Sequence, residues 1–226
     1  MSYYPVYLDL TDRLTVVVGG SALAEEKARG LVGVGARVKV IAKEVTAGLA
    51  ELAATGALMH AGRAFVGGDL AGALMAIVTE NDPGVREAVF AEAAAGNVLI
   101  NTVDDLPRCN WIAPSILRRG HLTIAISTAG KAPVLAVRLR QWLEKEIGAE
   151  HERFLEMASQ VRAPLAARHP DFEERRARWY RLIDSDVLAL LRRGEETAAQ
   201  GRFLEILGVA PPQASGIEPA LPAEHG

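Results

Sequence analysis

The stretch that decides the fold runs from Leu14 to Ile41 and reads LTVVVGGSALAEEKARGLVGVGARVKVI. It begins with an apolar strand, turns at a glycine pair, continues as a helical pattern and ends in a second apolar strand. This order predicts one βαβ unit with its tight turn at Gly19 and Gly20. Glycine lets the backbone approach a ligand, and the helix that follows offers free N–H groups and a positive dipole end to a pyrophosphate. The stretch therefore predicts a dinucleotide-binding site.

Strand-like and helical patterns continue to alternate beyond this unit. The apolar strand-like runs are Val6–Leu8, Leu14–Val18, Val38–Ile41, Leu74–Val78, Val98–Ile100 and Leu122–Ile126. The helical patterns between several of them are Ala22–Val34, Thr46–Ala54 and Gly84–Ala95. Strands that alternate with helices form mostly parallel sheets with both faces covered, so we expect a Rossmann-like α/β fold. In such folds ligands bind at the carboxyl ends of the strands.

The pattern changes after residue 132. Pro133–Ile147 reads as one amphipathic helix, and no strand signal follows it. Four short helices are expected at Glu150–Ala167, Asp171–Ile183, Ser185–Arg193 and Glu195–Leu207. We therefore expect a dinucleotide-binding domain over 1–114, a connecting segment over 115–149 and a helical domain over 150–208. The remainder, 209–226, is rich in Pro, Ala and Gly and is expected to be disordered.

Composition excludes several classes of protein. Half of the 226 residues are hydrophobic and 23% are charged, and the formal net charge of −3 gives no overall attraction to nucleic acid or to an anionic membrane. No apolar run has the length of a membrane span, and the N-terminus lacks a basic segment followed by an apolar one. The single cysteine, Cys109, cannot form an internal disulfide, and no Cys/His cluster suggests a metal site. We expect a cytoplasmic protein with no nucleic-acid, membrane or metal partner.

Three ordered segments carry a more specific signal. The first is Tyr4–Leu10 (YPVYLDL), followed by the VVVGG turn and Lys27. The second is Asn101–Asp105 (NTVDD), followed by Trp111–Ser115 (WIAPS). The third is Leu122–Ala136 (LTIAISTAGKAPVLA). Together they resemble the precorrin-2 dehydrogenase family, the N-terminal module of siroheme synthases, and the likeness is continuous over roughly the first 150 residues.

The resemblance implies a reaction and an assembly. The reaction is oxidation of precorrin-2, a reduced tetrapyrrole, to sirohydrochlorin with NAD as the hydride acceptor, and the assembly is a homodimer joined through Leu122–Ile147. A bifunctional enzyme that also inserts iron, and a module that senses NAD(H) without catalysis, are the alternatives. The methyltransferase domain of some relatives needs more chain than follows Leu207, so we expect it to be absent.

The candidate cofactor residues surround the glycine turn. Gly19 and Gly20 fit a pyrophosphate site, although the same residues make tight turns in any protein. The second glycine of the dinucleotide fingerprint falls at Ser21, whose side chain must point away from the phosphates or hydrogen-bond to them. Ala22 and Leu23 would offer backbone N–H groups to the pyrophosphate.

The second strand of the unit ends without the usual ribose-binding acid. Glu44 is the candidate for the ribose hydroxyls, and Lys43 would tolerate a 2′-phosphate. Both side chains fit a solvated surface equally well. The resemblance implies NAD, whereas these residues leave NADP open.

Asp104 is the candidate catalytic residue. Removing a hydride and a proton from a tetrapyrrole needs a general base, and a carboxylate can accept the proton. Asp104 follows a strand, at the rim where substrate should lie, and it matches the aspartate that is the proposed base in the family motif. The alternative is that Asp104 caps the helix after Pro107 or forms an Asx-turn. Asp105 reads as a turn residue.

The third segment departs from the family pattern. The family's Gly-Gly-x-Ser-Pro is AGKAP at Ala129–Pro133, so Ala132 lacks a hydroxyl that could cap the next helix or touch substrate. Lys131 adds a cation that suits a substrate with many carboxylates. Ser127, Thr128 and Lys131 are the candidate substrate-binding residues.

Arginines crowd the helical part of the chain. Interleaved acids favour ordinary salt-bridged helix faces, while a subset could hold substrate carboxylates in bidentate pairs. The arginines are Arg153, Arg162, Arg168, Arg175, Arg176, Arg178 and Arg181.

Overall fold

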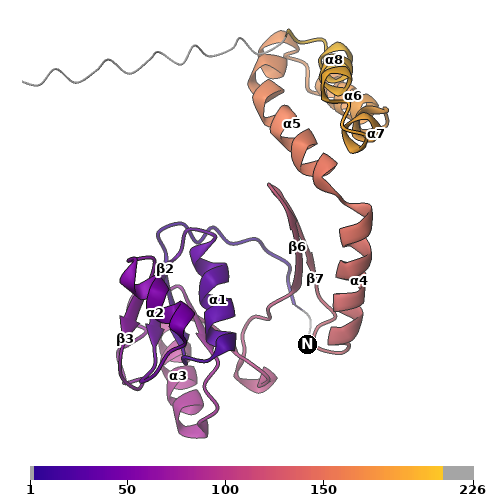
Figure 1. Ribbon diagram of the computed structural model, residues 1–226. Coiled ribbons are helices and arrows are strands. Elements are labelled where there is room, and N and C mark those ends of the chain that lie inside the picture. Colours follow the sequence, from indigo (N-terminus) through magenta and orange to yellow (C-terminus); the bar gives the residue numbers. More distant parts are fainter. Residues whose placement is uncertain (1–2, 211–226) are drawn as a thin grey trace, which may run out of the picture. The chain divides into compact units, whose positions relative to one another are not determined.

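The computed structural model describes residues 3–210, and their contacts form two compact units (Figure 1). The first unit comprises the chain up to Pro114 together with Ser127–Pro133. The second comprises Ser115–Ile126 and the chain from Val134 onward. The boundaries expected from the sequence at 114/115, 149/150 and 208/209 stay predictions, and residues 211–226 of the expected disordered tail lie outside the described residues.

A five-stranded parallel sheet forms the centre of the first unit. Its strands are β1 (Leu14–Val18), β2 (Arg37–Ile41), β3 (Met59–Ala61), β4 (Met75–Val78) and β5 (Leu99–Thr102). Their order across the sheet is β3-β2-β1-β4-β5. The chain runs outward from β1 in one direction through β2 and then in the other through β4. This reversal creates a crevice at the carboxyl end of β1, where doubly wound folds bind their ligands.

Helices cover both faces of this sheet, as the alternation of strands and helices along the sequence predicts. The helices are α1 (Ala22–Val32), α2 (Ala47–Ala54), α3 (Pro83–Gly96) and the 3₁₀ turn η1 (Leu106–Arg108). On one face Val17 and Val38 belong to a core with α1 and α2. On the other face Val16 and Val18 belong to a separate core with α3. The Rossmann-like architecture predicted from the sequence is confirmed.

Three strand assignments differ from the expectation. Val6–Leu8 forms no strand, because no neighbouring strand pairs with it and Pro5 lacks a backbone donor. β3 was not expected, since it is three residues long at the sheet edge and Met59 is half exposed. β6 (Ser115–Arg119) was not expected either, because only two of its five residues are apolar.

In its described residues, up to 210, the second unit contains a hairpin and five helices. β6 pairs with β7 (Leu122–Ile126) in an antiparallel hairpin. The helices are α4 (Pro133–Glu146), α5 (Ala149–Arg168), α6 (Phe172–Ile183), α7 (Val187–Arg192) and α8 (Glu196–Leu207). Helices α5–α8 enclose one core in which Phe203 contacts Phe154 and Trp179 edge-on. Within residues 3–210, the structure has no helix that combines the length and the apolarity of a membrane span.

A buried ion-pair cluster anchors the loop that joins β3 to β4. The Asp69 side chain is 4% exposed, and its carboxylate accepts hydrogen bonds from Lys39 Nζ at 2.8 Å and from Arg63 Nη1 and Nη2 at 2.6 and 2.7 Å. The Arg63 guanidinium, followed by Lys39 and the Val66 N–H, holds the pKa of Asp69 well below its ordinary value of 3.8.

We expect Asp69→Asn to lower the free energy of unfolding by about 3 kcal/mol at pH 7, because Arg63 and Lys39 lose their anion. An aspartate with a lowered folded pKa stabilises the protein above its unfolded pKa, and this contribution is lost as pH falls through the folded pKa. Urea unfolding of both proteins should therefore show a difference that is constant above about pH 5 and shrinks below about pH 4. A difference that does not change between pH 7 and pH 3 would contradict this assignment.

Candidate functional site

The glycine turn is required by the fold itself. Gly19 has φ +125°, and a Cβ there would lie 2.2 Å from the Thr79 hydroxyl oxygen. A Cβ on Gly20 would lie 1.8 Å from the carbonyl oxygen of Glu44. A side chain at either position would displace the residues that follow β4 or β2. The turn therefore brings the ends of β1, β2 and β4 into close approach.

The N-terminus of α1 presents unused backbone donors at this turn. The Ser21 hydroxyl caps the helix by accepting the Ala24 N–H at 3.4 Å, and the Ser21 carbonyl accepts the Glu25 N–H at 3.0 Å. The N–H groups of Ala22 and Leu23 have no acceptor in the described part of the chain, as expected for the first turn of a helix. Ser21 thus stabilises the helix end while leaving two donors free for an anion.

The loop after β2 lies against the same turn. The Thr46 N–H donates to the Gly20 carbonyl at 3.1 Å, which fixes the loop that carries Lys43 and Glu44. Both of these side chains are exposed. The Thr46 hydroxyl also donates to Glu25 in α1, and this bond, helped by Arg29, lowers the pKa of Glu25. Sequence and structure agree that Lys43 and Glu44 flank the turn, and their roles toward a ribose stay predictions.

Asp104 stands at the carboxyl end of β5 in a strained backbone conformation. Its φ is +59°, in the left-handed region, and its side chain is exposed with no hydrogen-bond partner among residues 3–210. It does not cap η1, which begins after Asp105. Asp105 pairs instead with Arg108 at 2.9 Å. An exposed carboxylate that makes no structural hydrogen bond is free to accept a proton.

A network of side-chain bonds holds the Asp104 turn. The Cys109 thiol sulfur accepts the Thr102 N–H at 3.2 Å and lies 3.2 and 3.3 Å from the carbonyl oxygens of Thr102 and Asp105. Burial raises the pKa of this thiol, so it remains a hydrogen-bond donor at neutral pH. The Asn110 side chain accepts the Ile100 N–H at 2.7 Å and donates to the Val98 carbonyl at 3.1 Å, both at the start of β5. Cys109 therefore closes the turn through its sulfur.

Arg86 in α3 joins two loops at the same edge. The sequence did not predict this role. Its guanidinium donates to the Glu80 carbonyl at 2.6 Å and to Asn81 Oδ1 at 2.8 Å. It also lies 3.9 Å from Asp105 Oδ2. Arg86 therefore ties the loop after β4 to the loop after β5, and no periodic pattern encodes such a contact between loops.

The third sequence motif packs beside the Asp104 loop. Ser127 Oγ accepts the Ala129 N–H at 3.0 Å and Thr128 Oγ1 accepts the Ala132 N–H at 3.2 Å, so both hydroxyls shape the turn before α4. A Cβ on Gly130, which has φ +76°, would lie 3.1 Å from Leu106 Cδ1 in η1. The motif at 127–133 therefore lies against the residues that follow Asp104.

These positions form one edge of one sheet. Adjacent strands lie about 4.8 Å apart, and β4 separates β1 from β5, so the glycine turn and the Asp104 turn start roughly 10 Å from each other. The free N–H groups of Ala22 and Leu23 fit a pyrophosphate, and the Thr102 hydroxyl, buried without a partner in the described chain, is a further unused polar atom at this edge. These donors suit the pyrophosphate of a dinucleotide. Within residues 3–210 no group of three or more His, Cys, Asp or Glu side chains is arranged to hold a metal ion.

Comparison with protein families covers most of the chain. Residues 6–115 match the family model described as "Putative NAD(P)-binding". Residues 119–146 match "Sirohaem biosynthesis protein central", and residues 152–207 match "Sirohaem synthase dimerisation region".

Individual relatives give the same result. The chain is 34% identical to the siroheme synthase of Chromobacterium violaceum, over 90% of this chain and 43% of that protein. It is 36% identical to the siroheme synthase of Azotobacter vinelandii, over 93% of this chain and 46% of that protein. The chain thus spans less than half the length of these curated relatives. A solved structure of SirC, precorrin-2 dehydrogenase, superposes with a TM-score of 0.75 at 25% identity, over 91% of this chain and 99% of that one. The chain belongs to the family of precorrin-2 dehydrogenases and siroheme synthase N-terminal modules.

Proposed function

We propose that this chain is an NAD-dependent precorrin-2 dehydrogenase that forms sirohydrochlorin in siroheme biosynthesis. The observation that carries the proposal is the shared sheet edge: the turn before the unpartnered helix N–H groups and the turn that carries Asp104 start at strands roughly 10 Å apart. The likeness to SirC over nearly all of that chain supports the same reaction.

The residues around the glycine turn would bind the cofactor. Ala22 and Leu23 would hold the pyrophosphate through their N–H groups, beside Gly19, Gly20 and the Ser21 cap. Glu44 would bind the adenosine ribose and Lys43 would lie close enough to accept a 2′-phosphate. NAD supplies, when bound, the acceptor for a hydride.

Asp104 is proposed as the general base of the oxidation. Precorrin-2 loses two hydrogens, one as a hydride and one as a proton, and the proton passes to the Asp104 carboxylate. The nearby network through Cys109 and Arg86 holds the Asp104 turn in place. Ser127, Thr128 and Lys131 would bind the substrate beside this turn, with Lys131 opposite a substrate carboxylate.

We propose a cytoplasmic homodimer without nucleic-acid or membrane partners. The match of residues 152–207 to a dimerisation region supports a dimer. Outside that region, α4 also carries exposed apolar side chains that a second copy would cover. These are Val134, Leu135, Leu139 and Trp142, which are 72%, 52%, 40% and 57% exposed. The single cysteine suits a reducing compartment, and the net charge of −3 gives no attraction to nucleic acid.

An anaerobic assay with freshly generated precorrin-2 tests the activity. Purified protein with NAD should give equal amounts of NADH and sirohydrochlorin. A protein that binds NAD but leaves precorrin-2 unchanged would be a nucleotide-sensing module instead. Adding Fe²⁺ to sirohydrochlorin in the absence of NAD asks separately whether the protein also inserts iron.

A further inference from the structure

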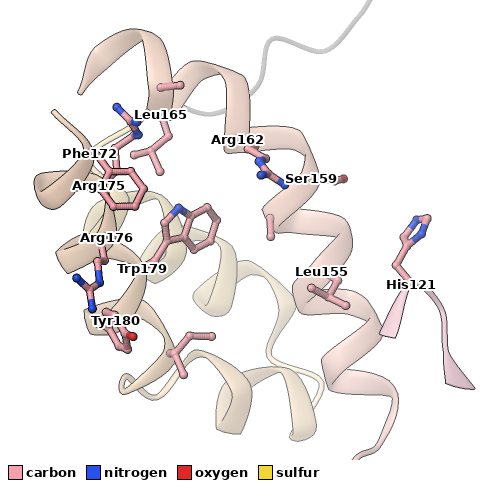
Figure 2. Close-up of a pocket in the computed structure, with 13 residues that line it drawn as sticks. His121, Leu155, Ser159, Arg162, Leu165, Phe172, Arg175, Arg176, Trp179 and Tyr180 are labelled. Atoms are coloured by element: carbon pink, nitrogen blue, oxygen red, sulfur yellow. The ribbon is translucent and has the colours of Figure 1, made fainter. Parts of the chain in front are cut away.

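A hollow of about 830 Å³ lies between α5 and α6, with Arg162, Trp179 and Tyr180 on its walls (Figure 2). Except for His121, the residues that line it fall within 152–207, which match a dimerisation region, so we expect a second copy of the chain to cover it. The side-chain contacts that bear on the reaction lie in the first unit instead. They are found at the carboxyl edge of the sheet, between the loops that follow β4 and β5.

The loop after β4 is fixed against the glycine turn. A Cβ on Gly19 would lie 2.2 Å from the Thr79 hydroxyl oxygen and 3.2 Å from the Glu80 nitrogen, so the two backbones are in close approach. The Thr79 N–H and hydroxyl both donate to the Val18 carbonyl, at 2.9 and 3.3 Å. The position of Glu80 is therefore set by the turn that precedes the free N–H groups of α1.

The loop after β5, which carries Asp104, lacks such a backbone connection. The last main-chain bond between these two strands and their loops joins the Val103 N–H to the Val78 carbonyl at 2.9 Å. Beyond it, within residues 3–210, no backbone hydrogen bond joins residues 79–82 to residues 104–108. Side chains must therefore set the distance between the two loops.

Arg86, in the first turn of α3, makes this connection. Its side chain is 18% exposed, and its guanidinium donates to the Glu80 carbonyl at 2.6 Å and to Asn81 Oδ1 at 2.8 Å. Arg86 Nη1 lies 3.9 Å from Asp105 Oδ2, on a carboxylate that is itself mostly buried. The rigid guanidinium fork can face three groups at once, whereas the ammonium group of a lysine is a single point charge on a flexible stem.

A second arginine holds Asp105 from the other side. The Asp105 carboxylate accepts a hydrogen bond from Arg108 Nη1 at 2.9 Å, and Arg108 also pairs with Glu87 of α3 at 2.8 Å. Asp105 is the neighbour of Asp104 in the chain. Contacts therefore run without a break from the glycine turn through Arg86 to the residue beside the proposed base.

We propose that Arg86 is a positioning residue for the oxidation, an inference that rests on the proposed function. It sets the distance between the glycine turn, which holds the cofactor, and the Asp104 carboxylate, which accepts the proton. A hydride and a proton leave the same substrate, so the hydride acceptor and the base must be correctly placed together. A displacement of about 1 Å can cost roughly a hundredfold in rate. Arg86 acts through Glu80 and Asp105 and not on the reacting atoms.

Arg86→Gln should lower the turnover of precorrin-2 at saturating NAD roughly ten- to a hundredfold, because the base is no longer fixed relative to the cofactor. The NAD affinity, measured by calorimetric titration, should stay close to that of the wild type, since the glycine turn and the helix that follows it are intact. Arg86→Lys keeps the charge but cannot bridge both loops, so it should be nearly as slow. Full turnover in Arg86→Lys would overturn the proposal, because charge alone would then be sufficient.

Cys109 gives a readout that needs neither substrate nor cofactor. It is the single cysteine among the 226 residues, and its sulfur lies 3.3 Å from the Asp105 carbonyl oxygen. Alkylation by iodoacetamide, followed by mass spectrometry of the full chain, therefore reports the opening of this turn. Arg86→Gln should be alkylated roughly tenfold faster than the wild type, since the turn loses a charge-assisted contact.

Arg63→Gln is the matched control. Arg63 also pairs with a buried carboxylate, that of Asp69, at 2.6 and 2.7 Å, but it follows β3 at the opposite side of the sheet from β5. Urea unfolding should show a lower stability for Arg63→Gln and for Arg86→Gln. Arg63→Gln should nevertheless keep the wild-type turnover at saturating NAD and the wild-type alkylation rate. An equal loss of turnover in both variants would trace the effect to lost stability and overturn the proposal.

The two readouts separate this proposal from the proposed function. Alkylation of Arg86→Gln at the wild-type rate would overturn the bridge between the loops, whatever reaction the protein catalyses. Wild-type turnover of Arg86→Gln in an active enzyme would overturn its positioning role, even if Cys109 reacts faster. A wild type that leaves precorrin-2 unchanged would refute the proposed function and with it the role in oxidation, whereas faster alkylation of Arg86→Gln would still establish the bridge.

Discussion

Asp104→Asn should lower the turnover of precorrin-2 by roughly 10² to 10⁴-fold, the usual contribution of a positioned general base. Asparagine has nearly the same shape and tolerates the left-handed backbone conformation that Asp104 adopts at φ +59°. The variant should therefore fold normally and lose only the ability to accept a proton. Single-turnover NADH formation under anaerobic conditions measures the effect, and calorimetric titration with NAD should give an unchanged affinity.

Asp12 supplies the matched control for this variant. It is also exposed and has φ +58°, so Asp12→Asn makes the same chemical change in the same backbone conformation. Asp12 lies before β1, away from the carboxyl edge of the sheet. We expect wild-type turnover from Asp12→Asn. Equal turnover in Asp104→Asn and the wild type would remove Asp104 from the mechanism.

The parts of the fold that could be predicted are those with a local signal. β1 and the end of β2 are buried and rich in valine and isoleucine, and a glycine pair follows β1, so the βαβ unit has a strong local signal. Helix starts were predictable from their caps, since Thr46, Asp82 and Asp171 each accept the N–H three residues ahead. β3 gave no such signal, because a short edge strand needs no apolar pattern.

The parts of the site that could not be predicted depend on contacts between loops. Asp104 was identified through its motif and its place after a strand, but neither its left-handed conformation nor the sulfur bonds of Cys109 to Thr102 and Asp105 had a sequence signal. The contacts of Arg86 with Glu80 and Asp105 join loops from different strands.

Gly20→Ala should damage both folding and cofactor binding, because its new Cβ would lie 1.8 Å from the Glu44 carbonyl oxygen and 2.9 Å from the carbonyl carbon. These are backbone atoms, which cannot rotate aside as a flexible side chain could. The loop that carries Lys43 and Glu44 would have to move, and the Thr46 N–H bond to the Gly20 carbonyl would be strained or lost. Overpacking against backbone should cost about 3 kcal/mol of unfolding free energy.

The same displacement should weaken NAD binding at least tenfold if the turn and the loop after β2 together hold the dinucleotide. Gly30→Ala is the matched control, because Gly30 lies in the same helix that follows the turn and an added Cβ there would meet no atom within 4 Å. In a helix interior this change should raise the unfolding free energy by about 0.5–1 kcal/mol. Urea unfolding and calorimetric titration with NAD on both variants measure the two effects separately. If Gly20→Ala unfolds at lower urea but binds NAD as tightly as Gly30→Ala, the glycine pair serves packing alone and the cofactor must lie elsewhere on the sheet edge.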